Sequence, residues 1–257
     1  MSALLEINKL TKSFGGLKAV SDFDLNINTG ELVGLIGPNG AGKTTVFNLI
    51  TGMYNPTLGS IKFQEHEISR LKPHKIAKLG ITRTFQNIRL FPELTVLDNV
   101  RIAYHFQTRC GICHTLFRTK RFNEEESQLR EKALEFLAIF GLETRYNEIS
   151  KNLPYGEQRR LEIARALVSE PKLLLLDEPA AGMNPFEVGR LMELISFIRD
   201  RFKLTILLIE HQMKVVMGIC ERVVAMDFGE IIAQGKPEQV QNDPKVIEAY
   251  LGSVTDS

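Results

Sequence analysis

The sequence has few of the features that direct a protein to a membrane, an oxidising compartment or nucleic acid. No hydrophobic run approaches the roughly 20 residues that a membrane-spanning helix needs. The first residues, Met-Ser-Ala-Leu-Leu-Glu, lack the basic and apolar parts of a secretory signal peptide. A net charge of +1 gives no reason to expect nucleic acid as the ligand. We therefore expect a cytoplasmic protein, for which any membrane role would require a separate membrane-spanning partner.

Cysteine is also scarce, at three residues: Cys110, Cys113 and Cys220. The segment Cys110-Gly111-Ile112-Cys113-His114 has the spacing of a c-type haem attachment site and of half a zinc site. Haem attachment belongs to exported proteins, however, and no second Cys/His pair follows to complete a zinc tetrahedron. We expect reduced structural thiols rather than a metal or haem site.

One loop carries the most specific pattern in the sequence. It matches G-x-x-x-x-G-K-[ST] at every fixed position, and its residues are Gly37-Pro38-Asn39-Gly40-Ala41-Gly42-Lys43-Thr44, followed by Thr45. Residues 32–36 before it have the pattern of a short buried strand, and residues 45–51 after it that of a helix. Because glycine lets the backbone wrap closely around an anion, the loop amides and the helix N-terminus can converge on a β-phosphate.

Two side chains complete the site that this loop predicts. Lys43 would bridge the β- and γ-phosphates, and the hydroxyl of Thr44 would ligate Mg²⁺. The loop therefore predicts that the chain binds a nucleoside triphosphate with magnesium.

Two strands are predicted before this loop, at residues 4–10 and 22–28. The second alternates strictly between polar and apolar residues, which is the period of a half-buried antiparallel strand. Between them, residues 11–16 read as a turn that carries Phe14. This ring could pack in the core or stack on an adenine base, and the residues alone do not decide between the two. A further strand is expected at residues 59–63.

Another strand-like run ends in two acids. Residues 173–176 are four leucines, followed by Asp177 and Glu178. Continuous apolar character fits a strand that is buried on both faces of a parallel sheet, and α/β sheets bind ligands at the carboxyl ends of such strands. Beside a phosphate loop, Asp177 could bind Mg²⁺ through water, and Glu178 could polarise the water that attacks a γ-phosphate.

Two more predicted strands end in polar residues. Residues 81–86 end in Gln86, and residues 204–209 are followed by Glu210 and His211. Taken alone, Gln86 would be a surface amide and His211 a structural histidine. Together with Asp177, however, they would leave parallel strands at one edge of the sheet, where Gln86 could reach Mg²⁺ or the attacking water.

Residues 95–152 change to the apolar spacing of helices. Within this stretch, residues 108–123 mix basic and apolar side chains, and the acidic run 124–126 is expected to begin a helix. We predict a helical insertion in the α/β core, which is either a solvated connector or a docking surface for another subunit. Beyond it, Asn184-Pro185 predicts a helix start, and residues 223–233 predict a hairpin.

With these motifs in this order, the chain resembles an ATP-binding cassette ATPase over about residues 4–252. The resemblance implies an α/β fold: a P-loop NTPase (RecA-like) core with a mostly parallel sheet, an N-terminal antiparallel β subdomain and an inserted α-helical subdomain. It implies a single domain, 1–257, with its nucleotide-binding core at 1–86 and 161–235, a helical subdomain at 87–160 and a helical tail at 236–257.

The resemblance also implies roles for single residues. Gln86 corresponds to the Q-loop glutamine, Asp177 to the magnesium-site aspartate, Glu178 to the catalytic base and His211 to the switch histidine. Phe14 corresponds to the aromatic residue that stacks on adenine, which favours that alternative over a place in the core. ATP and Mg²⁺ are thus the expected ligands.

The family's signature, L-S-G-G-Q, corresponds to Leu153-Pro154-Tyr155-Gly156-Glu157. In the family this segment caps the γ-phosphate of the partner subunit's ATP, so that two copies enclose two nucleotides. Here Pro154 replaces the serine and lacks both a hydroxyl and an N–H. The amides of Gly156 and Glu157 and the helix that begins there would then face the phosphate. Asn184 stands where the D-loop usually has aspartate.

Among subfamilies, the chain is most similar to the ATPase subunits of branched-chain amino-acid importers. The segments that carry this resemblance are 153–167 (LPYGEQRRLEIARAL), 177–185 (DEPAAGMNP) and 242–252 (NDPKVIEAYLG). The ATPases of urea importers and of the lipopolysaccharide exporter contain similar segments, so these residues do not identify the transported molecule. The implied partners are transmembrane permease subunits, a second ATPase subunit that is either identical or different and, indirectly, an extracytoplasmic solute-binding protein. The chain would lie on the inner face of the membrane through the permease.

Other functions on the same loop have less support. A Ras-type GTPase would need N-K-x-D, but residues 8–11 lack the aspartate and precede the loop. Non-transport cassettes of repair or translation usually carry a coiled-coil insertion or a second cassette, and neither is present. A cassette that binds ATP without hydrolysing it is suggested by Pro154 and Asn184, but the presence of Glu178 and His211 argues against it.

Overall fold

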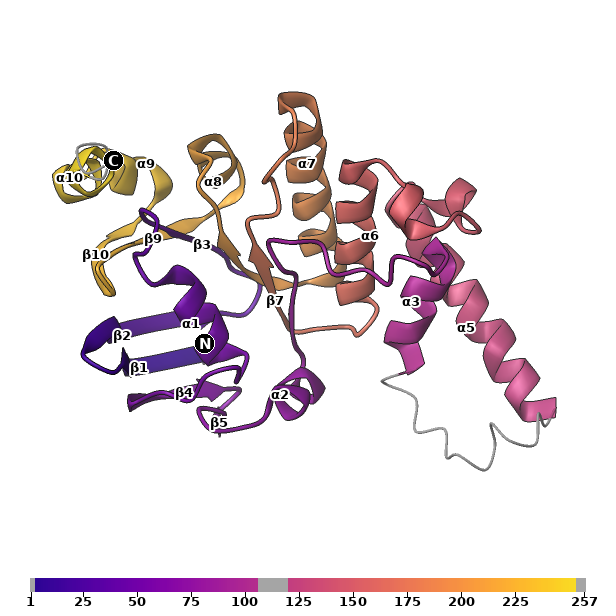
Figure 1. The fold of residues 1–257 in the computed structure, drawn as a ribbon, viewed down its shortest axis with the longest axis horizontal. Helices are drawn as coiled ribbons and strands as arrows, with labels where there is room; N and C mark the ends of the chain where they lie inside the picture. Colours follow the sequence, from indigo (N-terminus) through magenta and orange to yellow (C-terminus); the bar gives the residue numbers. More distant parts are fainter. Residues whose placement is uncertain (1–2, 106–119, 253–257) are drawn as a thin grey trace. The chain divides into compact units, whose positions relative to one another are not determined.

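In the computed structural model, which describes residues 3–105 and 120–252, the chain divides into two units. The first unit combines the chain up to Arg83 with the chain from Lys172 onward, and the second is Thr84–Pro171 (Figure 1). No helix in the described ranges is both long and apolar enough to cross a membrane.

A six-stranded sheet forms the centre of the first unit. Its strand order is β10-β9-β3-β8-β7-β6, and all neighbours are parallel except β9 and β10. Every residue of β3, β7 and β8 is buried, as expected from their continuous apolar runs. The strands are β3 (Leu32–Ile36), β6 (Ile81–Arg83), β7 (Leu173–Asp177), β8 (Thr205–Ile209), β9 (Arg222–Asp227) and β10 (Glu230–Gly235).

Strand register aligns the ends of the three buried strands. Leu35 of β3 and Asp177 of β7 both pair with Ile209, the last residue of β8. The residues that follow these three strands therefore leave the sheet at one edge, which is the arrangement that the sequence predicts.

The first unit also contains an antiparallel sheet of order β2-β1-β4-β5. Its strands are β1 (Ala3–Phe14), β2 (Leu17–Asn28), β4 (Leu58–Phe63) and β5 (His66–Glu67). The predicted turn at residues 11–16 is wrong for most of its length, because strand pairing continues to Phe14 with Leu17. Only Gly15 and Gly16 turn, and Gly15 has a φ of 58°, which glycine adopts without strain.

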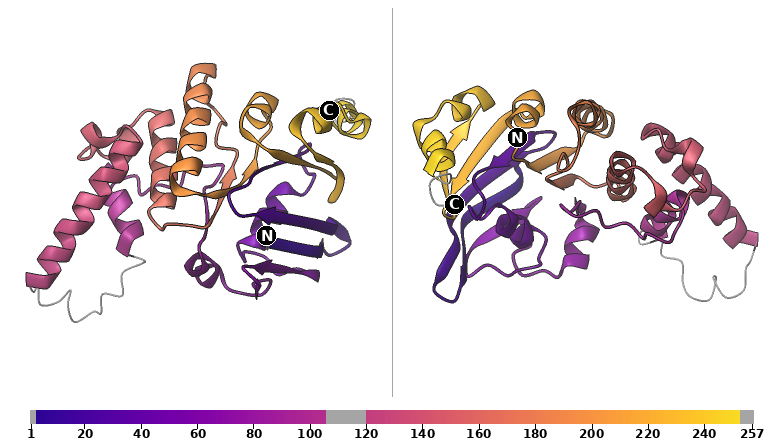
Figure 2. Two further views of the ribbon diagram at one scale, coloured as in Figure 1. Left: turned by 180° about the vertical axis from the view of Figure 1, so that it is seen from behind. Right: turned by 45° about the horizontal axis from the view of Figure 1, so that its top comes forward.

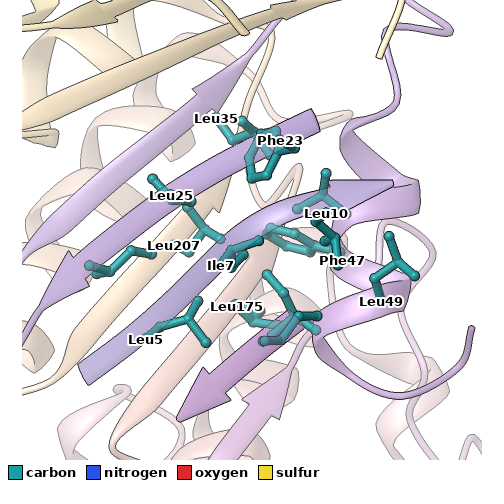
Figure 3. Close-up of a cluster of buried hydrophobic side chains, with 14 of the residues drawn as sticks. Leu5, Ile7, Leu10, Phe23, Leu25, Leu35, Phe47, Leu49, Leu175 and Leu207 are labelled. Atoms are coloured by element: carbon teal, nitrogen blue, oxygen red, sulfur yellow. The ribbon is translucent and has the colours of Figure 1, made fainter. Parts of the chain in front are cut away.

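A shared hydrophobic core joins the two sheets (Figure 3). Phe47 and Leu49 of helix α1 (Lys43–Ile50) are fully buried in it. The antiparallel sheet contributes Leu5, Ile7, Leu10, Phe23 and Leu25, and the parallel sheet Leu35, Leu175 and Leu207. The helix that begins at the phosphate loop is therefore anchored by the core of its unit.

The predicted helix start and helical tail of the first unit are present. Helix α7 (Pro185–Phe202) begins at the predicted Asn184-Pro185 start. The tail is helical, with α9 (Pro237–Gln241) and α10 (Pro244–Gly252). Two short helices that were not predicted are α8 (Met213–Ile219), which follows β8, and α2 (Pro73–Leu79), which precedes β6.

The second unit is helical, with α3 (Val96–His105), α5 (Lys120–Ile139) and α6 (Tyr155–Leu167), and the 3-10 turns η1 (Glu143–Arg145) and η2 (Ser150–Asn152). Its core contains Val100 from α3, Leu137 from α5 and Leu161 from α6, all fully buried. Helix α5 begins at Lys120, before the acidic run at 124–126 that the sequence analysis takes as the helix start.

The structure corrects the expectation for Gln86 and tests that for the cysteines only at Cys220. Strand β6 ends at Arg83, so Gln86 lies in the loop beyond it and not at the strand end. Of the three cysteines, Cys110 and Cys113 lie outside the described residues. Cys220 is a buried free thiol, and burial raises its pKa to about 12, which keeps it protonated and unreactive.

The start of α7 generates a stability prediction. The side chain of Asn184 accepts hydrogen bonds from the amides of Phe186 and Glu187, each at 3.0 Å, and the Glu187 carboxylate accepts from the amide of Asn184 at 3.0 Å. Asn184→Ala should lower the free energy of unfolding by about 0.5–2 kcal/mol, the usual value of an N-cap. Urea unfolding measures it. Asn184→Asp, which caps equally well, should stay near wild type, and equal losses in both variants would contradict a capping role.

Candidate functional site

The phosphate loop between β3 and α1 follows a path that only glycine permits at two positions. Gly37 has a φ of 150°, and a Cβ there would lie 2.1 Å from the carbonyl oxygen of Met226. Gly42, the residue before α1, has a φ of 102°, and its Cβ would lie 2.4 Å from the carbonyl oxygen of Ala19. Since contacts this short do not occur, the loop geometry excludes every other residue type at these two positions.

Lys43 lies within this loop. Its side chain is 5% exposed, and its amine donates to the carbonyl oxygens of Gly37 at 2.7 Å and Pro38 at 2.8 Å. Burial lowers the pKa of Lys43, while the negative charges of Glu178 and Asp177 oppose that shift. The loop thus holds a buried amine against its own carbonyls, close to two carboxylates.

The loop fits a phosphate group. The first turn of α1, which begins at Lys43 directly after the loop, leaves its amides without carbonyl partners inside the helix. Pro38, Asn39 and Gly40 lie at or near the surface, as do Thr44 and Thr45, while Ala41 is buried. Converging amides, one amine and an accessible rim are the groups that bind the β-phosphate of a nucleotide.

Asp177, the last residue of β7, is nearly buried and is held by a partner that sequence analysis missed. Arg83 at the end of β6 donates to its carboxylate at 2.6 Å and also to the side-chain oxygen of Asn48 in α1 at 2.7 Å. The guanidinium lies 5.3 Å from the ring centroid of Phe47. The available signal was a basic residue at the end of the strand that pairs with β7.

The donor set around Asp177 fits magnesium more closely than a tightly chelated transition metal. Within the described ranges, no group of three or more His, Cys, Asp or Glu side chains could hold a metal ion. Mg²⁺ is usually bound by one or two carboxylates together with water and substrate phosphates. Asp177 and the hydroxyl of Thr44 are protein oxygens of that kind.

Glu178 and His211, predicted from different strands, are brought into contact. His211 Nε2 lies 2.5 Å from Glu178 Oε1, and the amide of Glu178 donates to Ile209 at 2.9 Å. Glu178 has a φ of 47°, a conformation that costs energy for a residue other than glycine and that concentrates at functional sites. The pair places a carboxylate and an imidazole at the edge of the sheet where β7 and β8 end.

Glu210 supports this pair, a role that sequence analysis did not assign. It is 2% exposed, and its carboxylate accepts from the amides of Ala180 at 2.8 Å, His211 at 3.0 Å and Gln212 at 3.3 Å. Burial raises the pKa of Glu210, and these hydrogen bonds oppose the shift. One buried carboxylate therefore ties the segment after Glu178 to the segment that carries His211.

Phe14 lies at the end of β1 with its ring 44% exposed, so it is not a core residue. Tyr54 packs against it edge to face, with 5.2 Å between ring centroids. The amine of Lys12 lies 5.0 Å from the Phe14 centroid and donates to the carbonyl of Asn55 at 2.9 Å. An exposed aromatic ring held by neighbours is suited to stacking on a base.

In the second unit, Gln86 is exposed and the backbone around it is held by α6. Arg159 donates to the carbonyl oxygens of Phe85 at 2.6 Å and Gln86 at 2.7 Å. Glu162 accepts from the amides of Phe85 at 3.4 Å and Arg89 at 3.1 Å, and it pairs with Arg159 at 2.8 Å. Both charged side chains belong to α6 and are nearly or fully buried, so a buried ion pair on the helix holds the loop through hydrogen bonds to its backbone.

The segment 153–157 begins this same helix. Pro154 is the residue before α6, Leu153 is buried and Tyr155 is 42% exposed. The amide of Glu157 donates to the carbonyl of Pro154 at 2.9 Å, because it belongs to the first helical turn. The amides of Gly156 and Glu157 both lie in this first turn, and their approach to a phosphate stays a prediction.

The structure thus groups the predicted residues in two sets. Within the first unit it brings together the phosphate loop, Asp177, Glu178 and His211, with Phe14 at the end of a neighbouring strand. Gln86 and residues 153–157 belong to the second unit, where α6 connects them.

Comparison with known proteins gives consistent matches. Residues 20–181 match the family described as ABC transporter, and residues 230–255 match branched-chain amino acid ATP-binding cassette transporter. Over 249 residues, the chain is 48% identical to the high-affinity branched-chain amino acid transport ATP-binding protein LivG of Escherichia coli (strain K12), covering 97% of this chain and 98% of the relative. It is 46% identical to BraF of Pseudomonas aeruginosa, with the same coverage. The lipopolysaccharide export system ATP-binding protein LptB of Haemophilus influenzae is 38% identical, covering 97% of this chain and 98% of LptB.

Solved structures confirm the predicted fold class. An ATP-binding cassette of an ABC transporter, crystallised in its ADP conformation, matches with a TM-score of 0.85 and 32% identity, covering 98% of this chain and 100% of that one. A dimeric bacterial ABC transporter cassette matches with a TM-score of 0.77 and 27% identity, covering 91% and 98% of the two chains.

The contacts of Glu210 generate a prediction for the strand-end loops. In Glu210→Gln, one side-chain oxygen can still accept a hydrogen bond, but the new NH₂ group meets a backbone N–H and cannot. We expect the free energy of unfolding to fall by about 1–3 kcal/mol, the cost of a buried donor left unpaired. Urea unfolding measures this loss. The control is Glu221→Gln, whose side chain is 53% exposed and which should change stability little. A Glu210→Gln protein as stable as wild type would contradict the supporting role.

Proposed function

The chain belongs to the ABC transporter family, and on this premise we propose that it is the ATP-hydrolysing subunit that drives an importer of branched-chain amino acids. The observation that carries the amino-acid assignment is the match of residues 230–255 to cassettes of that transport class, together with full-length similarity to LivG and BraF. Cassettes of this family hydrolyse ATP to power transport.

The chemistry follows from the groups at the end of the parallel sheet. The amides of the phosphate loop and Lys43 bind the β- and γ-phosphates of ATP. Thr44, Gln86 and Asp177 would hold Mg²⁺, which neutralises charge on those phosphates. Lys43, now hydrogen-bonded to loop carbonyls, would donate to phosphate oxygens instead.

Glu178 acts as the general base in this proposal. Its carboxylate takes a proton from the water that attacks the γ-phosphorus, and His211 holds the carboxylate in place through their hydrogen bond. The positive φ of Glu178 turns its side chain out of the strand direction, and Glu210 fixes the backbone on either side of the pair. These supports keep the base in one position without help from the substrate.

The second unit supplies the remaining parts. Its segment 153–157 would cap the γ-phosphate of a second cassette, so that two subunits, identical or different, enclose two nucleotides. The residues of this segment are Leu153, Pro154, Tyr155, Gly156 and Glu157. Because Arg159 and Glu162 connect this helix to the backbone at Phe85 and Gln86, a shift of one segment would move the other. Phe14 would stack on the adenine of ATP bound in its own subunit.

Docking to the permease is assigned to the loop around Phe91. The Phe91 ring is 44% exposed, but its backbone is fixed by hydrogen bonds with Asn99 and by the hydroxyl of Ser150. The guanidinium of Arg165 lies 5.5 Å from the ring centroid. An exposed aromatic side chain on a rigid backbone is typical of an anchor at a protein interface. Through this contact the chain would lie on the inner face of the membrane, and a solute-binding protein would deliver cargo on the other side.

The alternative function is that of a related transporter: the chain would be the ATPase of a urea importer or of a lipopolysaccharide exporter such as the one that contains LptB. Uptake assays with the complete transporter in vesicles separate these functions. The proposal predicts ATP-dependent uptake of leucine, isoleucine or valine that excess urea does not inhibit. Urea uptake without amino-acid uptake would overturn the substrate assignment and leave the ATPase assignment intact.

Glu178 gives the first functional prediction. Glu178→Gln should retain ATP binding but lower the single-turnover hydrolysis rate by about 10²–10⁴, the usual contribution of a general base. The variant should accumulate as an ATP-bound dimer, with a second ATPase if the pair is mixed. As a contrast, Lys43→Ala should lose ATP binding itself in an equilibrium titration. Unchanged single-turnover hydrolysis by Glu178→Gln would show that another group is the base.

Phe91 gives the second functional prediction. Phe91→Asp should separate ATP hydrolysis from uptake in the reconstituted transporter, because a charge on the anchor opposes docking, while ATP affinity should stay within about twofold of wild type. A matched control is Phe197→Asp on α7, a ring that is 51% exposed on the first unit. The docking assignment fails if transport survives Phe91→Asp, or if both variants abolish transport equally.

A further inference from the structure

The C-terminal helix α10 makes one contact with the phosphate loop that no part of the mechanism above uses. The hydroxyl oxygen of Tyr250 accepts a hydrogen bond from the amide of Gly37 at 2.9 Å. These residues are 213 positions apart in the chain, and both belong to the first unit. Gly37 is the first residue of the loop, so the contact lies at the point where β3 ends and the loop begins.

The fold brings α10 to this place through the last strands. Strand β9 pairs with β3, and β10 pairs with β9. Helix α10 packs on β10 and on α9, and both turned views show the two yellow C-terminal helices beside that strand (Figure 2). Val246, 4% exposed, anchors the helix, so Tyr250 is presented from a packed element rather than from a free end.

The Gly37 amide needs this partner. Gly37 is buried, and the last pair of the β3–β9 ladder is Ile36 with Ala225, so its amide lies beyond the end of the ladder. A buried N–H without a partner costs about 1–3 kcal/mol. The Cα of Gly37 lies against Met226, whose carbonyl leaves no room for a Cβ. Met226 therefore constrains the Cα of Gly37, and Tyr250 constrains its amide.

Gly37 also holds the lysine of the site, through its other backbone group. Its carbonyl oxygen, which belongs to the following peptide, accepts from the amine of Lys43 at 2.7 Å, so one residue connects Tyr250 to Lys43. If the backbone at Gly37 shifts, both the start of the loop and the position of the Lys43 amine change. A loop that is correctly arranged for only part of the time binds its ligand more weakly by that fraction.

We propose that Tyr250 is a positioning residue of the nucleotide site: its hydroxyl holds the Gly37 amide so that the phosphate loop is arranged for the β-phosphate before nucleotide binds. Helix α10 is then a part of the ATP site and not an appendage of the cassette. The inference rests on the proposed binding of nucleotide at this loop. It assigns no chemical step to Tyr250, because the hydroxyl contacts the backbone and not a reacting atom.

The test is Tyr250→Phe, which removes only the hydroxyl oxygen. The dissociation constant for ADP, measured by equilibrium titration, should rise about two- to twelvefold, the range that one neutral hydrogen bond represents. The KM for ATP should rise in parallel, with little change in kcat at saturating ATP, since Glu178 and His211 are untouched. Amide hydrogen exchange at Gly37 in the nucleotide-free protein should become faster.

Tyr104→Phe is the matched control. It makes the same chemical change at a buried tyrosine of the second unit, 6% exposed, and should leave ADP affinity unchanged. The inference is overturned if Tyr250→Phe binds ADP as wild type does, if Gly37 exchange is unaltered, or if Tyr104→Phe weakens binding equally. It is also overturned if kcat falls while KM stays constant. Failure of the wild-type protein to bind ADP would instead contradict the proposed function.

Discussion

The path of the backbone through Gly37 and Gly42 is the constraint on which the rest of the site depends. At both residues a Cβ would lie within 2.4 Å of a carbonyl oxygen, so the loop can close against β9 and β2 only if both side chains are absent. That closure places the amine of Lys43 within hydrogen-bond distance of the carbonyl oxygens of Gly37 and Pro38. Helix α1 is in turn fixed by Phe47 in the hydrophobic core, so burial of apolar surface stabilises the loop from which the helix begins.

Polar groups around this loop are held by buried charges rather than by the ligand. Glu210 binds three backbone amides beside Glu178 and His211, and Arg83 holds Asp177. In the second unit, the Arg159–Glu162 pair holds the backbone at Gln86. Breaking a buried pair of this kind costs far more than the net contribution of the pair to stability. Such groups therefore favour one arrangement of the loops over others, which suits a site that must meet a phosphate with fixed geometry.

The sequence predicts strands and helix starts well where neighbouring residues in the chain determine them, through continuous apolar character or through a helix cap. Four consecutive leucines and the acids after them gave a buried parallel strand with its carboxylates at the sheet edge, and Asn184-Pro185 gave a helix start. It fails where the partner is distant in the chain: neither the contact of Tyr250 with Gly37 nor that of Glu210 with Ala180 has a local signal. The turn expected around Phe14 was wrong because pairing with β2 overrides polar turn composition.

The central claim, that the loop at 37–44 binds the β- and γ-phosphates, can be tested most directly on the wild-type chain. Equilibrium titrations with ATP, ADP and AMP compare nucleotides that share the same base and sugar and differ only in phosphates. ATP and ADP should bind, and AMP should bind at least about tenfold more weakly, because each charge-assisted hydrogen bond lost with the β-phosphate is worth about 1.5–3 kcal/mol. Equal affinity for all three nucleotides would mean that binding depends on the base alone, and it would contradict the account.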